Sequence, residues 1–193
     1  TLHVANDNSF GGQSVSVDAA IGIAAADGDR TISEDFTLGA DLRLAEGDDI
    51  DLSGTLTANQ FFTLTVNNAP DPGANDTANE LSGTLALGGN SAVVTGPEDL
   101  LISGNVTGTA SLDKTGTGRL TLSSNNAGFT GTLNVTAGQV FIGDNNNASI
   151  GGDAEINGGE LRLEGTVTGN ATVTSGGRLF GQGAVIGDSL TVG

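Results

Sequence analysis

Residues 112–143, LDKTGTGRLTLSSNNAGFTGTLNVTAGQVFIG, decide the fold class of this chain. Apolar side chains recur there two residues apart, a period that places them on one face of a β-strand. The pairs are Leu120 and Leu122, Leu133 and Val135, and Val140 and Ile142. The segments between the pairs are rich in glycine, serine and asparagine, which favour turns. The stretch therefore predicts three short strands joined by compact turns, and no amphipathic helix.

An internal repeat follows this stretch. GGDAEINGGELRLEG (151–165) and GNATVTSGGRLFGQG (169–183) align with an offset of 18, and GDSLTVG (187–193) opens a third copy. Gly138–Gln139–Val140 precedes Gly159–Glu160–Leu161 by 21 residues. A translational repeat of this length is typical of a parallel β-helix, in which each coil stacks on the next. The repeat therefore predicts that Val140 lies beside Leu161, and Leu161 beside Leu179.

We expect an all-β fold, a right-handed single-stranded parallel β-helix (β-solenoid) that spans residues 1–193 as a single domain. About ten coils fit the length, spaced by about 4.8 Å, the distance between neighbouring strands. A β-sandwich or a flat meander would need hairpins, and Asn157–Gly158 is a hairpin signal. However, hairpins would reverse the chain between copies, whereas these copies superpose as translations, so we favour the solenoid.

The first half of the chain continues the pattern less regularly. Residues 18–26, DAAIGIAAA, suit a brief helix or an apolar strand, and Gly22 lowers the helix propensity. Residues 67–80 hold two of the three prolines and predict either an exposed loop or a hinge between two halves. Strand patterning resumes at once at Leu81, which favours the loop. The clearest repeats lie in residues 112–193.

Residues 112–143 resemble the autotransporter-associated β-strand repeat of the passenger regions of secreted bacterial surface proteins. The matching residues are Leu112, Lys114, Gly116, Gly118, Leu120, Leu122, Asn125 or Asn126, Phe129, Gly131, Val135, Ala137, Gly138, Val140 and Gly143. Phe129 stands where the family often has tyrosine, and Thr130 where it often has a second glycine. One copy covers about a sixth of the chain, related motifs extend to Gly193, and residues 1–100 match in style alone.

The resemblance implies a segment of a bacterial autotransporter passenger, a rigid extracellular stalk with a role in adhesion, cell–cell contact and virulence. Its expected partner is a host or neighbouring-cell surface, or a second copy of the chain. The alternative is a self-associating aggregation or biofilm module, or a glycan-binding or glycan-processing β-helix. The resemblance also implies a place on the bacterial cell surface, anchored in the outer membrane through a β-barrel absent from this chain. The lack of cysteine fits such export, because a premature disulfide would hinder translocation.

Charge and length exclude several classes of function. The net charge is −17, and residues 1–100 carry 16 acidic against 2 basic residues. Nucleic acids and anionic membranes require clustered lysine and arginine, so we expect no nucleic acid partner. No apolar run approaches the roughly 20 residues of a membrane-spanning helix, and we expect no membrane insertion of this piece, which begins at Thr1 without a signal peptide. Solubility accounts for the acidity, with halophilic adaptation or divalent-cation binding as alternatives.

The inventory of reactive side chains predicts no catalytic, cofactor or metal site. Gly187–Asp188–Ser189–Leu190 matches the serine motif of a lipase and esterase family, but the one histidine, His3, would lie at the far end of a rod. We interpret the motif as a turn. The chain has no cysteine, and one histidine cannot build a usual zinc site. We therefore expect that the chain is not an enzyme.

The densest acidic cluster is Asp48, Asp49 and Asp51. Glycan-processing β-helices use such carboxylates, but they also line a groove with aromatic or basic side chains. Calcium would suit the acids better, although EF-hand spacing and the nonapeptide GGxGxDxUx are absent. We interpret the cluster and Asp27–Gly28–Asp29 as solvated turns. The remaining predictions are surface positions for His3, Arg30 and Arg43, and a stacked turn or loose loop at Asn145–Asn147.

Overall fold

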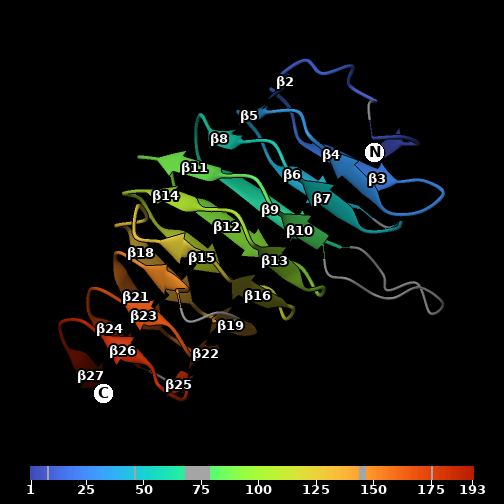
Figure 1. The fold of residues 1–193 in the computed structure, drawn as a ribbon. Coiled ribbons are helices and arrows are strands. Elements are labelled where there is room, and N and C mark those ends of the chain that lie inside the picture. The colour runs from blue at the N-terminus through green and yellow to red at the C-terminus, as the bar shows by residue number, and fades with distance from the viewer. Residues whose placement is uncertain (8, 46, 68–78, 144–146, 175) are drawn as a thin grey trace.

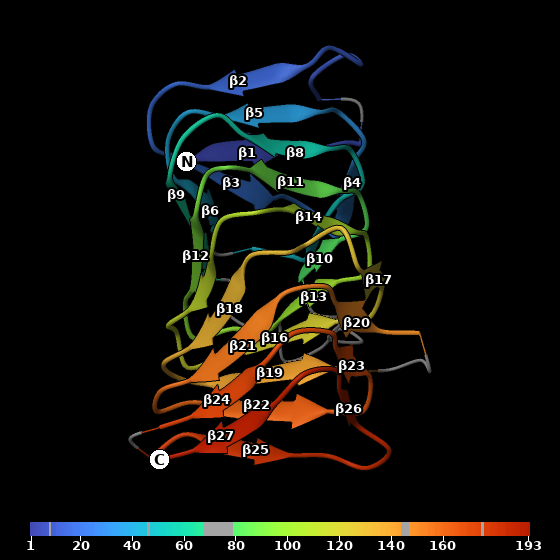
Figure 2. The ribbon, with the colours of Figure 1, turned by 90° about the vertical axis from the view of Figure 1, so that its left-hand side faces the viewer.

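The computed structural model is a parallel β-solenoid of about eight turns, close to the ten expected, and it describes all residues except 8, 46, 68–78, 144–146 and 175 (Figure 1). The described residues form 27 strands and no helix. In each turn the chain passes through one strand of each of three faces. Figure 2 shows the turns stacked from β2 at one end to β27 at the other.

Four sheets make up the three faces, because the third face changes sheet halfway along. Sheet A contains β1 (Leu2–Val4), β3 (Ile21–Ala25), β6 (Leu42–Leu44), β9 (Phe62–Val66), β12 (Ala92–Thr95), β15 (Leu112–Lys114), β18 (Thr132–Val135), β21 (Asp153–Ile156), β24 (Ala171–Val173) and β27 (Leu190–Val192). Sheet C contains β4 (Arg30–Ile32), β7 (Ile50–Leu52), β10 (Asn79–Leu81), β13 (Leu100–Ile102), β16 (Arg119–Leu122), β19 (Gln139–Ile142), β22 (Glu160–Leu163) and β25 (Arg178–Phe180). Sheet B contains β2 (Val15–Val17), β5 (Phe36–Leu38), β8 (Leu56–Ala58), β11 (Leu85–Gly88) and β14 (Val106–Gly108); sheet D contains β17 (Asn125–Asn126), β20 (Ser149–Ile150), β23 (Thr166–Val167) and β26 (Val185–Ile186).

The strand register confirms the predicted stacking. Val140 pairs with Leu161, and Leu161 pairs with Leu179, all in parallel ladders. The hairpin signal at Asn157–Gly158 instead forms a corner, since it joins β21 of sheet A to β22 of sheet C. The chain therefore winds repeatedly in one sense, because each turn leaves its strand beside the equivalent strand of the turn before.

The core is a column of aliphatic side chains that point inward from all faces. In sheet C, for example, Leu100, Leu120, Val140 and Leu161 stack in register and are at most 1% exposed. Each such side chain contributes about 1.5–3 kcal/mol by leaving water. At the C-terminal turn the inward-facing Leu190 and Val192 are 53% and 72% exposed, because no further described strand covers β27.

The sequence left alternatives open for several segments. Residues 18–26 include the strand β3, so the helix alternative is wrong; pairing with β1 and β6 outweighs the alanine content. Residues 68–78 of the predicted loop lie outside the described residues, and the loop prediction is wrong for Asn79 and Glu80, which belong to β10, where Asn79 is buried. The flanking strands continue the solenoid. In sheet A β9 pairs with β6 and β12, and in sheet C β10 pairs with β7 and β13. Of Asn145–Asn147, Asn147 alone is described, and it is exposed.

Candidate functional site

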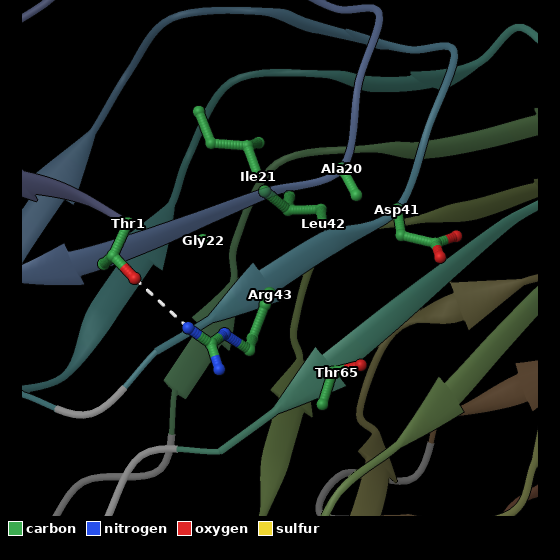
Figure 3. A pocket seen from close by; sticks show the side chains of 8 residues that line it. All are labelled: Thr1, Ala20, Ile21, Gly22, Asp41, Leu42, Arg43 and Thr65. Atoms are coloured by element: carbon green, nitrogen blue, oxygen red, sulfur yellow. Dashed lines mark hydrogen bonds between the residues drawn. The ribbon is translucent and has the colours of Figure 1, made fainter.

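A hollow of about 300 Å³ opens on the outer face of sheet A, near its N-terminal edge (Figure 3). Gly22, Arg43 and Thr65 occupy equivalent positions on β3, β6 and β9. Because Gly22 has no side chain, the Arg43 side chain lies across it, and a Cβ atom there would be 3.3 Å from Arg43 Nε. The lining residues are Thr1, Ala20, Ile21, Gly22, Asp41, Leu42, Arg43 and Thr65.

The chemistry of this hollow is that of a binding surface. Arg43 is exposed as predicted, and its Nη2 donates to the Thr1 hydroxyl at 3.1 Å. A guanidinium offers several donors in one plane, which suits a carboxylate or phosphate. Asp41 lies on the other side of the hollow and accepts the Thr63 amide N–H at 2.8 Å. The lining contains hydroxyl groups but neither histidine nor cysteine to act beside them.

The predicted acidic cluster lies near the start of sheet C and is used by the backbone. Asp48 accepts the Gly28 amide N–H at 2.6 Å, and Asp51 accepts the Ser82 hydroxyl at 2.7 Å. Asp49 and Asp51 also line a groove of about 140 Å³. Among the described residues, no three histidine, cysteine, aspartate or glutamate side chains stand close enough to hold a metal ion. Asp48 and Asp49 precede β7, whereas Asp51 lies within that strand, so the prediction that all three are turn residues is wrong for Asp51, and the acids also connect neighbouring turns.

This use of carboxylates extends along the solenoid. An aspartate in one turn accepts the amide N–H of the equivalent corner in the next turn, where the strand ladder ends. The pairs are Asp35 with Thr55 at 2.7 Å, Asp99 with Arg119 at 2.6 Å, and Asp153 with Asn170 at 2.7 Å. These three hydrogen bonds are exposed, so each stabilises its corner modestly, by about 1 kcal/mol. The acidity thus has a structural use besides solubility.

The structure also places the other residues that the sequence singled out. His3 lies on β1, at the opposite end of sheet A from Ser189, which precedes β27 (Figure 1). The Ser189 hydroxyl donates to the Asn170 side chain at 2.6 Å. Arg30 lies at the surface, as predicted, and it also holds the turn that precedes it. Arg30 is half-buried, and its guanidinium donates to the carbonyl groups of residues 26, 27 and 29, because it folds back over that turn.

Lys114 is a buried lysine whose position the sequence analysis did not single out. It pairs with Val94 and Val135 at inward positions of sheet A and is 2% exposed. Its Nζ donates to the Gly116 carbonyl. Burial lowers the pKa of Lys114 to about 8, with the nearby Asp99 carboxylate acting in the opposite direction. The strand period itself predicts this inward position, because a period of two places Lys114 on the same face as Leu112.

Lys114 predicts that the protein becomes more stable as pH rises from about 8 to 10.5. In this window the unfolded chain binds a proton that the folded chain has released, so the free energy of unfolding increases with pH. The full gain is about 3 kcal/mol at 1.36 kcal/mol per pKa unit. Urea unfolding at several pH values measures it. Lys114 dominates the side-chain titration between pH 8 and 10.5, because it is the single lysine and the chain has neither tyrosine nor cysteine.

The matched variant is Lys114→Met, which keeps the length of the side chain and removes the charge. Its unfolding free energy should be nearly constant between pH 8 and 10.5 and should exceed that of the wild type at pH 7.5. A flat profile in the wild type, or an equal slope in both proteins, would contradict the assignment.

Comparison with known proteins gives no relative: no protein-family model, no curated protein and no solved structure matches the chain. In the part of the chain that the structure describes, no helix has the length and apolar character needed to cross a membrane.

Proposed function

We propose that this chain is a rigid spacer in the extracellular passenger of a bacterial autotransporter, with a role in adhesion or cell–cell contact. The observation that carries the proposal is the ten-stranded sheet A, which runs from β1 to β27 with a parallel partner at every step. The resemblance of residues 112–143 to the autotransporter-associated repeat supports the setting on a cell surface. The bacterial surface and its host or neighbouring-cell partner are part of the same proposal.

The geometry favours stiffness along the axis. Each internal strand of sheets A and C has backbone partners in both neighbouring turns, and the inward side chains form one continuous cluster. Bending the rod would separate ladders on one face and compress side chains on another, and close-packed interiors resist both. A segment of this kind transmits position from one end to the other, which is the property a stalk needs.

Spin labels measure this rigidity within one chain. Thr63 and Thr172 lie in the same outward column of sheet A, five strand steps apart, so labels on T63C and T172C should be separated by about 24 Å with a narrow distribution. The chain has no natural cysteine to interfere. Deletion of residues 113–133 removes one turn in register, because Leu112 pairs with Leu133. The separation should then fall to about 19 Å.

A deletion of residues 113–132 is the matched control, since it shifts the register by one residue, turns the inward side chains of β18 outward and should destabilise the fold. A broad distance distribution, or a separation that the in-register deletion leaves unchanged, would contradict a rigid spacer. In a complete surface protein, removal of the segment should shorten the projection from the cell and reduce adhesion. Unchanged projection and adhesion would contradict the proposed function itself.

A further inference from the structure

The outer face of sheet C changes charge along the solenoid. Its central outward column runs, in register, through Thr31, Asp51, Glu80, Leu101, Thr121, Phe141, Arg162 and Phe180. The column beside it begins with Asp29 and Asp49 and ends with Glu160 and Arg178. The face is therefore acidic near the N-terminal end, whereas it carries arginine and aromatic side chains near the C-terminal end.

The C-terminal half of this face differs from the rest of a strongly acidic protein. Three of the six basic residues of the chain, Arg119, Arg162 and Arg178, lie there. Arg119 pairs with Asp99 at 3.1 Å, Arg178 with Glu160 at 3.2 Å, and Arg162 with Glu164, and all six side chains are at least one third exposed. Exposed pairs of this kind contribute little to stability, so the arginines remain available to further carboxylates.

Aromatic and arginine side chains also lie together in the central column. The guanidinium carbon of Arg162 is 4.8 Å from the centre of the Phe141 ring, and Phe180 follows in the next strand at 45% exposure. Arginine and aromatic residues are enriched at protein–protein interfaces, particularly among the residues that contribute most binding energy. The composition of this half therefore favours a protein partner.

We propose that the outer face of sheet C binds the same face of a second copy of this chain, with the two rods antiparallel. A two-fold axis along the strand direction between β13 and β16 generates this arrangement and makes the interface self-complementary. Each oppositely charged pair then forms twice. The pairs are Asp51 with the partner's Arg162, Asp29 with the partner's Arg178, and Asp99 with the partner's Arg119.

Charge selects this occupant and this orientation. Parallel rods would place Asp51 opposite the partner's Asp51, and like charges across an interface are repelled. A uniformly acidic partner would match the arginine half alone and a uniformly basic one the acidic half alone, whereas a second copy presents both signs in reversed order and so opposes the overall repulsion between two chains of charge −17. The antiparallel arrangement also opposes Asp49 to the partner's Glu160, and the pairing of Glu160 with Arg178 offsets this repulsion.

The dimensions predict a weak contact. Eight strands of three or four residues give a face of about 38 Å by 10–13 Å, which is below the area of a standard stable interface. The dimer should therefore be weak and sensitive to salt, and many copies on one surface would strengthen it by avidity. This dimer would be the molecular contact in the proposed cell–cell adhesion, so its biological setting rests on the proposed function. Its test does not, because dimerisation is measured on the purified chain.

Analytical ultracentrifugation with a charge swap tests the interface. The wild type should dimerise at about 0.15 M salt, where a Debye length of about 8 Å screens the overall repulsion between two acidic chains more than it weakens the close opposite pairs. Arg162→Glu or Asp51→Arg alone should weaken dimerisation at least about tenfold, and the double variant should recover to within about threefold of the wild type. Glu155→Arg is the matched charge reversal on the outer face of sheet A, where Glu155 is exposed, and it should leave dimerisation unchanged.

Thermal unfolding of each variant verifies that it is folded, and Arg178→Glu provides a second reversal that leaves the Asp51 contact with Ser82 intact. A wild type that stays monomeric at millimolar concentration would overturn the proposal. So would a dimer that reversals at positions 162 and 178 leave unchanged, because association would then use another surface. Spin-label distances within one chain are independent of these outcomes, so failure of the interface and failure of the spacer are distinguishable.

Discussion

Replacement of Gly104 by alanine is expected to destabilise the solenoid by about 3 kcal/mol or more, a cost at the upper end of core overpacking. Gly104 lies at the corner between sheets C and B, directly next to the corner of the preceding turn. A Cβ atom there would lie 1.7 Å from the Gly83 carbonyl oxygen and 2.5 Å from its carbon. Both atoms belong to the backbone, so no side chain can rotate away. The turns must separate, and the ladders on both sides must distort.

The same close approach repeats at this corner. A Cβ atom on Gly83 would lie 1.9 Å from the Gly54 carbonyl oxygen, and one on Gly54 would lie 2.1 Å from the Glu34 carbonyl oxygen. Gly83→Ala should therefore resemble Gly104→Ala. Gly89→Ala is the matched control, because nothing lies within 4 Å of its Cβ position, and it should unfold at about the wild-type urea concentration. Equal midpoints for Gly104→Ala and Gly89→Ala would contradict this account of the corner.

The sequence itself contains a signal for this corner, a short Ser-Gly motif. Ser53–Gly54, Ser82–Gly83 and Ser103–Gly104 each precede a threonine or asparagine and then an apolar strand. Their spacings of 29 and 21 residues differ, because the first turn contains residues 68–78. A search for one fixed period therefore misses them, whereas alignment on the short Ser-Gly motif finds them.

The fold itself was accessible from the sequence for two physical reasons. A period of two identifies strands without knowledge of their partners, and the translational repeat identifies the partners of Val140 and Leu161. Parallel stacking then follows, because two copies related by translation cannot pair as a hairpin. The predicted solenoid needed no information beyond these residues.

The candidate sites were not accessible in the same way, because they depend on register between turns of unequal length. The step from Ala154 to Ala171 is 17 residues, that from Leu112 to Leu133 is 21, and that from Phe62 to Ala92 is 30. Local periodicity does not specify these steps. The column that brings Phe141, Arg162 and Phe180 together therefore appears only once each strand has its neighbour.

Replacement of Leu161 by aspartate is expected to disrupt the stack at β22 and to cost about 3–5 kcal/mol. Leu161 is fully buried, and its register partners are Val140 in the turn before and Leu179 in the turn after. An aspartate there would place a carboxylate among aliphatic side chains, without a hydrogen-bond donor, and would also remove the contacts of the leucine. Urea unfolding measures the loss, and strand content by circular dichroism shows whether the remaining turns keep their structure.

Leu161→Ala and Glu160→Ala separate the contributions to this loss. Leu161→Ala removes the packing without adding a charge and should cost about 2–5 kcal/mol, less than aspartate at the same position. Glu160 lies one residue away on the outward face, where it pairs with the exposed Arg178, and its replacement should cost less than about 1 kcal/mol. If Glu160→Ala destabilised the protein as much as Leu161→Asp, the inward and outward faces of β22 would be wrongly assigned. Such a result would also remove the basis for a continuous apolar column, on which the stiffness of the spacer depends.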